Sequence, residues 1–230
     1  MEVRYNKNQV LRYLGYKANN GKPPQDLMDK IEDLYQNVIR KHQLYNVHRK
    51  FELDKSDENS YYLLETNLVI KSSNVIEHLE ESNCCMLIAV CFDQKLDRII
   101  QKMEITNFHD SILLDFIASS VIEAYQDAIV EEINKEVRKK GEFLTEPFSP
   151  GYGNWGIEVQ KNICDILDTK RKIGLYTNEN NILLPRKAQT AIVGVANKAQ
   201  KMRIRGCAYC NLVKNCLYRK RGVTCEDDYK

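Results

Sequence analysis

One long helical pattern near the middle of the chain constrains its fold more than any other feature. Between about Ser111 and Gly141, apolar residues recur at three- and four-residue spacing, which places them on one face of an α-helix. This apolar face consists of Leu114, Ile117, Val121, Ala124, Tyr125, Ala128 and Ile129. We expect Asp110 to cap the amino end of the helix and Gly141 to end it.

Shorter patterns around this helix predict a mixed fold. The apolar run at 85–92 suits a buried strand. Further strands are expected at 45–53, 61–70, 173–177, 181–185 and 189–195, and further helices at 27–39, 75–81, 94–105 and 156–167. Because strands and helices interleave irregularly and not as repeated βαβ units, we expect an α+β fold with an antiparallel sheet and flanking helices.

Length and charge narrow the class of protein. The 230 residues suffice for one large domain with an appendage, and we expect a domain at 1–200 and a tail at 201–230. A net charge of +2 is too small for a chain that binds nucleic acid with its whole surface. Neither a signal-peptide core at the start nor an apolar run long enough for a bilayer is visible. We therefore expect a cytoplasmic protein with no membrane partner.

The tail predicts a metal centre. Cys207 and Cys210 have the C-x2-C spacing with which two thiolates reach one metal, and Cys216 and Cys225 complete a set of four. Such a set can hold zinc or an iron–sulfur cluster, and the spacing does not separate the two. Basic residues without an acidic one surround the thiols between 201 and 225, which favours thiolates. The alternatives are a solvated basic tail with unligated thiols and, less favoured, a nucleic-acid-binding tail.

The most distinctive motif is the loop Ser149-Pro150-Gly151-Tyr152-Gly153. Pro150 restricts the backbone, while Gly151 allows a conformation that other residues avoid. Main-chain groups beside an aromatic ring can bind a flat ligand, with Tyr152 supplying a stacking or hydroxyl contact. The same residues also make ordinary turns.

Three separated segments, in order and at suitable spacing, carry a family resemblance. VLRYLGYK at 10–17, FSPGYGNW at 148–155 and NILLPRKAQTAIVGV at 181–195 resemble the activation (reactivation) domain of cobalamin-dependent methionine synthase, nearest to its free-standing form. The resemblance covers most of residues 5–197. It implies an α+β domain with a curved antiparallel sheet, which agrees with the periodicity.

The resemblance also implies S-adenosylmethionine-binding residues. Gly151 and Tyr152 match the family loop Arg-x-x-x-Gly-Tyr, and Ser149 falls where a main-chain contact is expected. Glu123 falls where the family places a carboxylate that pairs with the ligand amino group. The arginine that holds the ligand carboxylate is replaced here by Pro147, which carries no charge.

Two further positions bear on this departure. Arg186 or Lys187, in the matching LLPRK turn, is a candidate for the missing cation. Asp93 stands where free-standing relatives usually have glycine, and the sequence does not tell whether it disturbs the site.

The resemblance implies an accessory protein for reductive reactivation of a protein-bound cobalamin. S-adenosylmethionine would remethylate the reduced cobalt, and the cobalamin would belong to a methionine synthase or another corrinoid protein. A low-potential donor of the flavodoxin or ferredoxin type would supply the electron, and an iron–sulfur tail would suit a relay. The alternative is a docking or scaffold protein that no longer binds S-adenosylmethionine, which Pro147 favours. Because the cobalt would lie on the partner, the sequence leaves open whether the chain alone is an enzyme.

Overall fold

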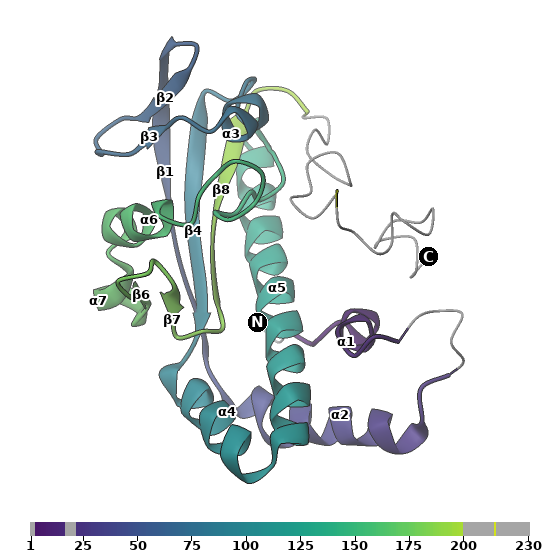
Figure 1. Cartoon of the computed structure of the whole chain (residues 1–230). Coiled ribbons are helices and arrows are strands. Elements are labelled where there is room, and N and C mark those ends of the chain that lie inside the picture. The colour runs from purple at the N-terminus through teal and green to yellow at the C-terminus, as the bar shows by residue number, and fades with distance from the viewer. Residues whose placement is uncertain (1–2, 17–21, 200–213, 215–230) are drawn as a thin grey trace.

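The computed structural model of the chain describes residues 3–16, 22–199 and 214, and it has a six-stranded antiparallel sheet at its centre (Figure 1). The strand order is β3-β2-β1-β4-β8-β5. Their bounds are β1 Leu44–Asp57, β2 Ser60–Leu63, β3 Val69–Ile70, β4 Cys84–Phe92, β5 Phe143–Leu144 and β8 Ala188–Ala196. The predicted α+β fold with an antiparallel sheet and flanking helices is confirmed.

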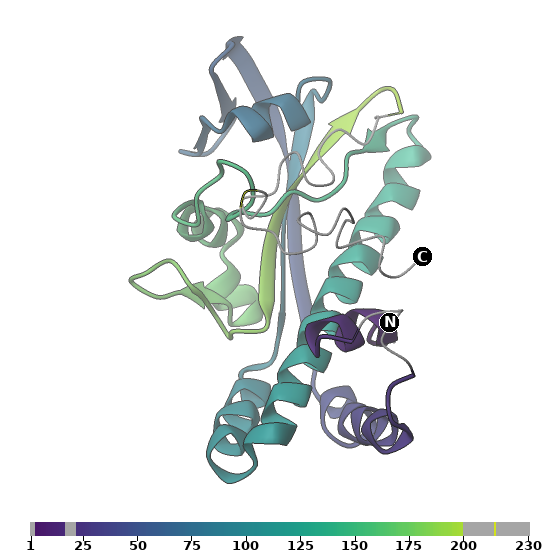
Figure 2. The ribbon, with the colours of Figure 1, turned by 45° about the vertical axis from the view of Figure 1, so that its right-hand side comes forward.

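Helices cover both faces of this sheet (Figure 2). One face packs against α1 Lys7–Tyr13, α2 Gln25–Asn37, the 3-10 turn η1 Ile39–Lys41, α4 Gln94–Thr106 and α5 Phe108–Arg138. The other face carries α3 Ser73–His78, α6 Val159–Leu167, α7 Thr169–Ile173 and a small sheet of β6 Tyr176–Thr177 and β7 Leu183–Leu184. Two hydrophobic clusters result, one on each side.

The central strand β4 supplies both clusters because side chains alternate across a sheet. Ile88, Val90 and Phe92 pack with α5, whereas Leu87, Ala89 and Cys91 pack with α6. All six of these side chains are buried. This explains why 85–92 is a continuous apolar run: both of its faces are covered.

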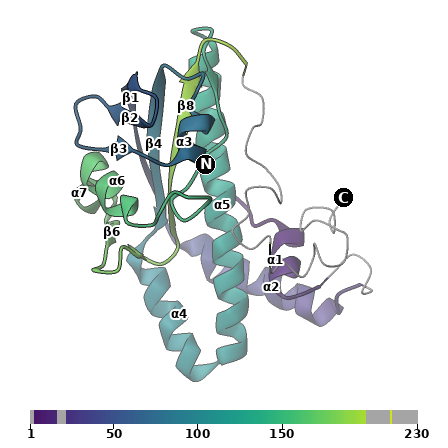
Figure 3. The same cartoon turned by 45° about the horizontal axis from the view of Figure 1, so that its top comes forward.

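The long helix α5 runs the length of the sheet, as Figures 1 and 3 show, but its start differs from the prediction. The cap is Asn107, whose side-chain oxygen accepts from the N–H of Asp110 at 3.2 Å. Asp110 lies inside the first turn, where its carboxylate forms an ion pair with Lys30 at 2.6 Å. Both residues are good caps by type, so the sequence could not separate them. Gly141 follows the helix with φ +75°, as a helix-ending glycine should.

Other boundaries also differ. The strand predicted at 61–70 is two strands, β2 and β3, separated by a turn in which Glu65 has φ +64°. The strand predicted at 173–177 is the end of α7 followed by Gly174 at φ +70° and the short β6. The sequence prediction missed α1 and α7. Both are short helices of seven and five residues, for which periodicity is a weak signal.

The predicted thiolate site lies outside the described residues. The structure does not describe its four residues, Cys207, Cys210, Cys216 and Cys225. The division into a domain at 1–200 and a tail at 201–230 also stays a prediction. Within the described part of the chain, no helix has the length and apolar character that crossing a bilayer requires.

Candidate functional site

The loop 148–155 is a compact turn attached to β8. Phe148 pairs with Ile192 of β8 through two backbone hydrogen bonds of 2.9 and 2.8 Å. Gly151 has φ +94°, and its N–H donates to the carbonyl of Trp155 at 2.7 Å. Ser149, Gly151 and Tyr152 are therefore brought together in one turn. Tyr152 points outward enough to leave 68% of its surface exposed.

Asn154 ties this loop to α3. Its side chain accepts from the Ser72 hydroxyl at 2.5 Å and donates to the Ser73 hydroxyl at 2.8 Å. Its N–H donates to the side chain of Asn74 at 3.0 Å. The next residue, Trp155, is only 3% exposed and belongs to the hydrophobic cluster on the α6 side of the sheet. The base of the loop is therefore fixed, while Tyr152 is presented to solvent.

Beside the loop, the first part of β8 has no strand partner among the described residues on the edge that faces away from β4, whereas β5 pairs with the end of β8 at Val195 and Ala196. Ile192 directs its N–H and carbonyl away from β4, toward Phe148. In an antiparallel strand, the backbone N–H and carbonyl groups of every second residue point to the same edge. Ala188 and Thr190 therefore direct these groups to the same edge as Ile192 does. Among the described residues, no group pairs with the backbone of these two. We call this short stretch, Ala188–Thr190, the unpaired edge.

Thr190 adds a side-chain group near that edge. It is 2% exposed, and its hydroxyl has no hydrogen-bond partner in the described part of the protein. Leaving buried polar groups unpaired costs free energy. The unpaired edge is therefore chemically suited to a ligand that offers hydrogen-bond donors and acceptors.

Glu123 lies on α5 and faces α1. Its carboxylate accepts from the Tyr13 hydroxyl at 2.9 Å and from the side-chain amide of Gln9. Burial, together with the adjacent Glu123 charge, raises the pKa of Tyr13 to about 12, so this hydroxyl remains a donor at neutral pH. The buried hydroxyl of Ser120 supports the contact by donating to the Gln9 side chain at 2.7 Å.

A hollow of about 370 Å³ opens beside Glu123, between α1 and α5. Its lining consists of Asn6, Asn8, Gln9, Arg12, Glu123, Ala124 and Asp127. We call it the α1–α5 hollow. It combines one guanidinium with two carboxylates and several amides, and sequence reasoning missed it because α1 was not predicted.

The two cations proposed as replacements for the missing arginine both have carboxylate partners. The guanidinium of Arg186 contacts Glu104 at 3.1 Å, and the backbone N–H of Arg186 donates to the side chain of Asp97. The ammonium of Lys187 lies 2.7 Å from Asp115 and 2.9 Å from the Ser119 hydroxyl, both on α5. Neither is an uncommitted cation. The Lys187 contact nevertheless places the start of β8 against the α5 turn that precedes Glu123.

Glu123 and the loop flank β8 from different faces. Glu123 belongs to α5, which covers one face of the sheet (Figure 2), and the loop packs through Trp155 on the other face. Within the described residues, no hydrogen bond or common hollow joins Glu123 to Ser149–Tyr152. A ligand that contacted both would have to extend across the edge of β8.

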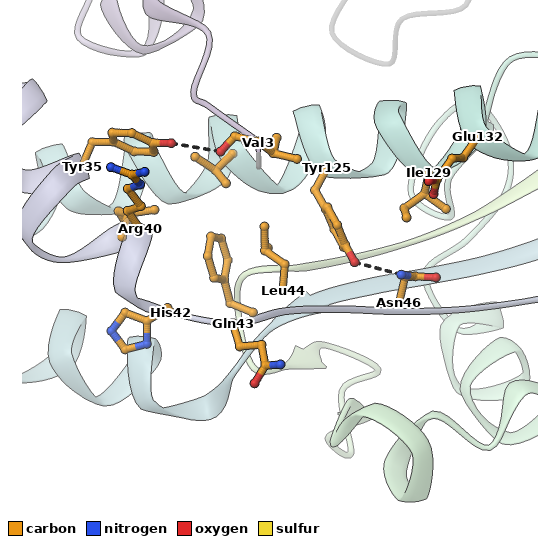
Figure 4. Close-up of a pocket in the computed structure, with 13 residues that line it drawn as sticks. Val3, Tyr35, Arg40, His42, Gln43, Leu44, Asn46, Tyr125, Ile129 and Glu132 are labelled. Carbon is orange, nitrogen blue, oxygen red and sulfur yellow. Dashed lines mark hydrogen bonds between the residues drawn. The ribbon is translucent and has the colours of Figure 1, made fainter. Parts of the chain in front are cut away.

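A larger hollow of about 710 Å³ lies elsewhere, between β1, η1 and α5 (Figure 4). It contains none of the predicted ligand-binding residues. Asn46 donates to the Tyr125 hydroxyl at 2.8 Å, and the Tyr35 hydroxyl donates to the carbonyl of Val3 at 3.0 Å (Figure 4). His42 is held by Asp93 at 2.9 Å. Because much of its polar lining is already paired, this hollow is the weaker candidate.

The described residues hold no cluster of metal-ligating side chains. Three of the four described cysteines, Cys85, Cys91 and Cys164, are buried. Burial raises the pKa of Cys91 to about 12, which keeps this thiol protonated and unreactive. These cysteines pack as small apolar residues.

Comparison with known proteins identifies the fold. No protein-family model matches the sequence, and no curated protein matches it. Among solved structures, a crystal structure of the MetH reactivation domain bound to AdoHcy matches with a TM-score of 0.66, covering 97% of this chain and 83% of that chain. Sequence identity is 11%, so the match shows the fold alone. The fold expected from the three sequence segments is confirmed.

Proposed function

We propose that this chain binds S-adenosylmethionine across the unpaired edge of β8 and assists the reductive remethylation of a cobalamin carried by a partner protein. The observation that supports it is that the backbones of Ala188 and Thr190, beside the Ser149–Tyr152 turn, have no hydrogen-bond partner in the described part of the chain. A solved protein of the same fold, the MetH reactivation domain, was crystallised with AdoHcy.

Each part of the site would have a distinct task. Backbone groups at Thr190 and in the turn would hydrogen-bond the flat adenine, and Tyr152 would cover its outer side. Glu123 would receive the ammonium group of the ligand. The protein would then hold the sulfonium methyl at a fixed place on its surface, which lowers the entropic cost of methyl transfer.

The cobalt chemistry would belong to the partner. Once a low-potential donor of the flavodoxin or ferredoxin type had supplied one electron, the reduced cobalamin would take the methyl group from the sulfonium and leave S-adenosylhomocysteine. The partner would be a methionine synthase or another corrinoid protein. A zinc or iron–sulfur centre at Cys207, Cys210, Cys216 and Cys225 remains a prediction, which metal analysis and an absorption spectrum of anaerobically purified protein would test.

Pro147 favours a second function, in which the chain is a docking protein that no longer binds S-adenosylmethionine. This position carries no charge, and Arg186 and Lys187 are committed to other carboxylates. Losing a bidentate arginine–carboxylate contact would weaken ligand binding strongly.

Isothermal titration of the full chain with S-adenosylmethionine separates the two functions. The proposal predicts saturable heat at micromolar ligand with one site per chain. S-adenosylhomocysteine, which lacks only the transferred methyl group, should compete for that site. An absence of heat up to millimolar ligand would reject the proposal in favour of the docking function.

A further inference from the structure

The α1–α5 hollow places opposite charges in one small cavity. Arg12 of α1 and Glu123 of α5 both line it, and Asp127 lies one helical turn beyond Glu123. Its volume of about 370 Å³ leaves room for an amino-acid group. The hollow is therefore suited to a zwitterionic part of a larger ligand.

Arg12 supplies the positive charge among the described residues that line this hollow. Its guanidinium lies over the Tyr13 ring, 5.6 Å from the centroid. No described carboxylate forms an ion pair with it, in contrast to Arg4 with Glu32 and Arg186 with Glu104. The same guanidinium also acts on the Tyr13 hydroxyl, but it carries five N–H donors, so N–H groups remain for a ligand.

The carboxylate of Glu123 has the complementary property. Its two described partners, the Tyr13 hydroxyl and the Gln9 amide, are both neutral. Neutral donors hold a carboxylate in place without cancelling its charge, so it can still attract an ammonium group. Arg12 and Tyr13 are adjacent on α1, so one short helix both carries the cation and fixes the anion.

We propose that the α1–α5 hollow binds the α-amino-acid group of the ligand, with Arg12 holding its carboxylate and Glu123 its ammonium. This inference rests on the proposed S-adenosyl ligand. It assigns to α1 the cation that Pro147 removes from the loop. The sequence separation of the two sites, residue 12 and residue 147, explains why the loop motif alone gives no sign of the replacement.

The test compares two ligands that differ only in the carboxylate. S-adenosylmethionine and its decarboxylated form are titrated into the full chain, into Arg12→Ala and into Arg12→Lys. The parent should prefer the complete ligand by about ten- to a hundredfold, the usual worth of a charged hydrogen-bonded pair. Arg12→Ala should lose this preference while binding the decarboxylated ligand as the parent does. Arg12→Lys should retain part of it, because lysine keeps the charge without the planar fork.

The exposed Lys7 provides the matched control. It lies on the same helix, and Lys7→Ala removes one positive charge without touching the lining of the hollow. This variant should keep the parent's ligand preference, and circular dichroism should show that all variants are folded. Equal affinity of Arg12→Ala and the parent for the complete ligand would overturn the inference but leave the proposed function standing. If the parent binds neither ligand, both fail.

Discussion

At the scale of single residues, the proposed ligand site depends on the backbone of Gly151. At φ +94° this position favours glycine, and a Cβ built there would lie 3.3 Å from the Cγ2 of Ile157. Gly141 has a similar conformation, φ +75°, but open space around it, in a turn after α5. Substitution by alanine would therefore strain the backbone at both positions, but only at Gly151 would the new side chain meet a neighbour.

Gly151→Ala should weaken S-adenosylmethionine binding by about tenfold or more, because a strain of about 1–3 kcal/mol is relieved by shifting the turn. Gly141→Ala should destabilise the fold by a similar strain of about 1–3 kcal/mol, but it should bind the ligand as the parent does. Calorimetric titration and urea unfolding of both variants measure the two effects. Equal binding by the two variants would mean that the turn takes no part in the site.

Residue types in the loop were readable from sequence, whereas residue partners were not. Gly151 and Tyr152 are marked by a motif, and the structure places them with Ser149 in one turn. The pairing of Glu123 with Tyr13 spans 110 residues of sequence, and that of Lys187 with Ser119 spans 68. Local patterns contain no information about such contacts, since they depend on how helices pack.

At the scale of elements, Asp93 links three parts of the fold. It caps α4 by accepting from the N–H groups of Lys95 and Leu96 at 2.9 and 3.2 Å. It also accepts from the N–H of Gln43 at 3.0 Å and contacts His42. Asp93 therefore joins the end of β4, the start of β1 and α4. None of the predicted site residues is among these partners.

This role predicts an acid-dependent contribution to stability. Burial raises the pKa of Asp93, but the hydrogen bonds from Gln43 and His42 outweigh it and hold that pKa below its ordinary value. A lowered pKa stabilises the fold above the unfolded-state value of about 4, and the gain is lost as pH falls through the lower folded-state value. Asp93→Ala should cost about 1–2 kcal/mol at neutral pH.

Urea unfolding of the parent and of Asp93→Ala between about pH 7 and pH 2 measures this effect. The difference in unfolding free energy should shrink below about pH 4. Asp93→Asn should retain most of the cap at neutral pH, because asparagine also accepts the N–H bonds, but its stability should lack the acid-dependent part. A difference between parent and Asp93→Ala that is constant with pH would contradict the role given to the carboxylate.

At the scale of the whole molecule, the class of fold was predictable and the shape of the site was not. The continuous apolar run of β4 and the one-sided stripe of α5 correctly indicated a sheet with helices packed on it. The unpaired edge of β8 arises because the chain pairs with β8 at Phe148 and then turns away at Pro150 and Gly151. The order of the strands and the residue at which the chain leaves β8 depend on tertiary packing. The residue pattern of 189–195 therefore does not predict them.

Amide hydrogen exchange at Ala188 and Thr190, measured by nuclear magnetic resonance with and without saturating S-adenosylhomocysteine, tests whether a ligand binds at the unpaired edge. If a ligand bonds to the unpaired edge, exchange at Thr190 should slow on its addition, together with exchange in the Ser149–Tyr152 turn. Saturable binding that leaves exchange at Thr190 unchanged and protects only residues around the larger hollow of Figure 4 would contradict ligand binding at the unpaired edge.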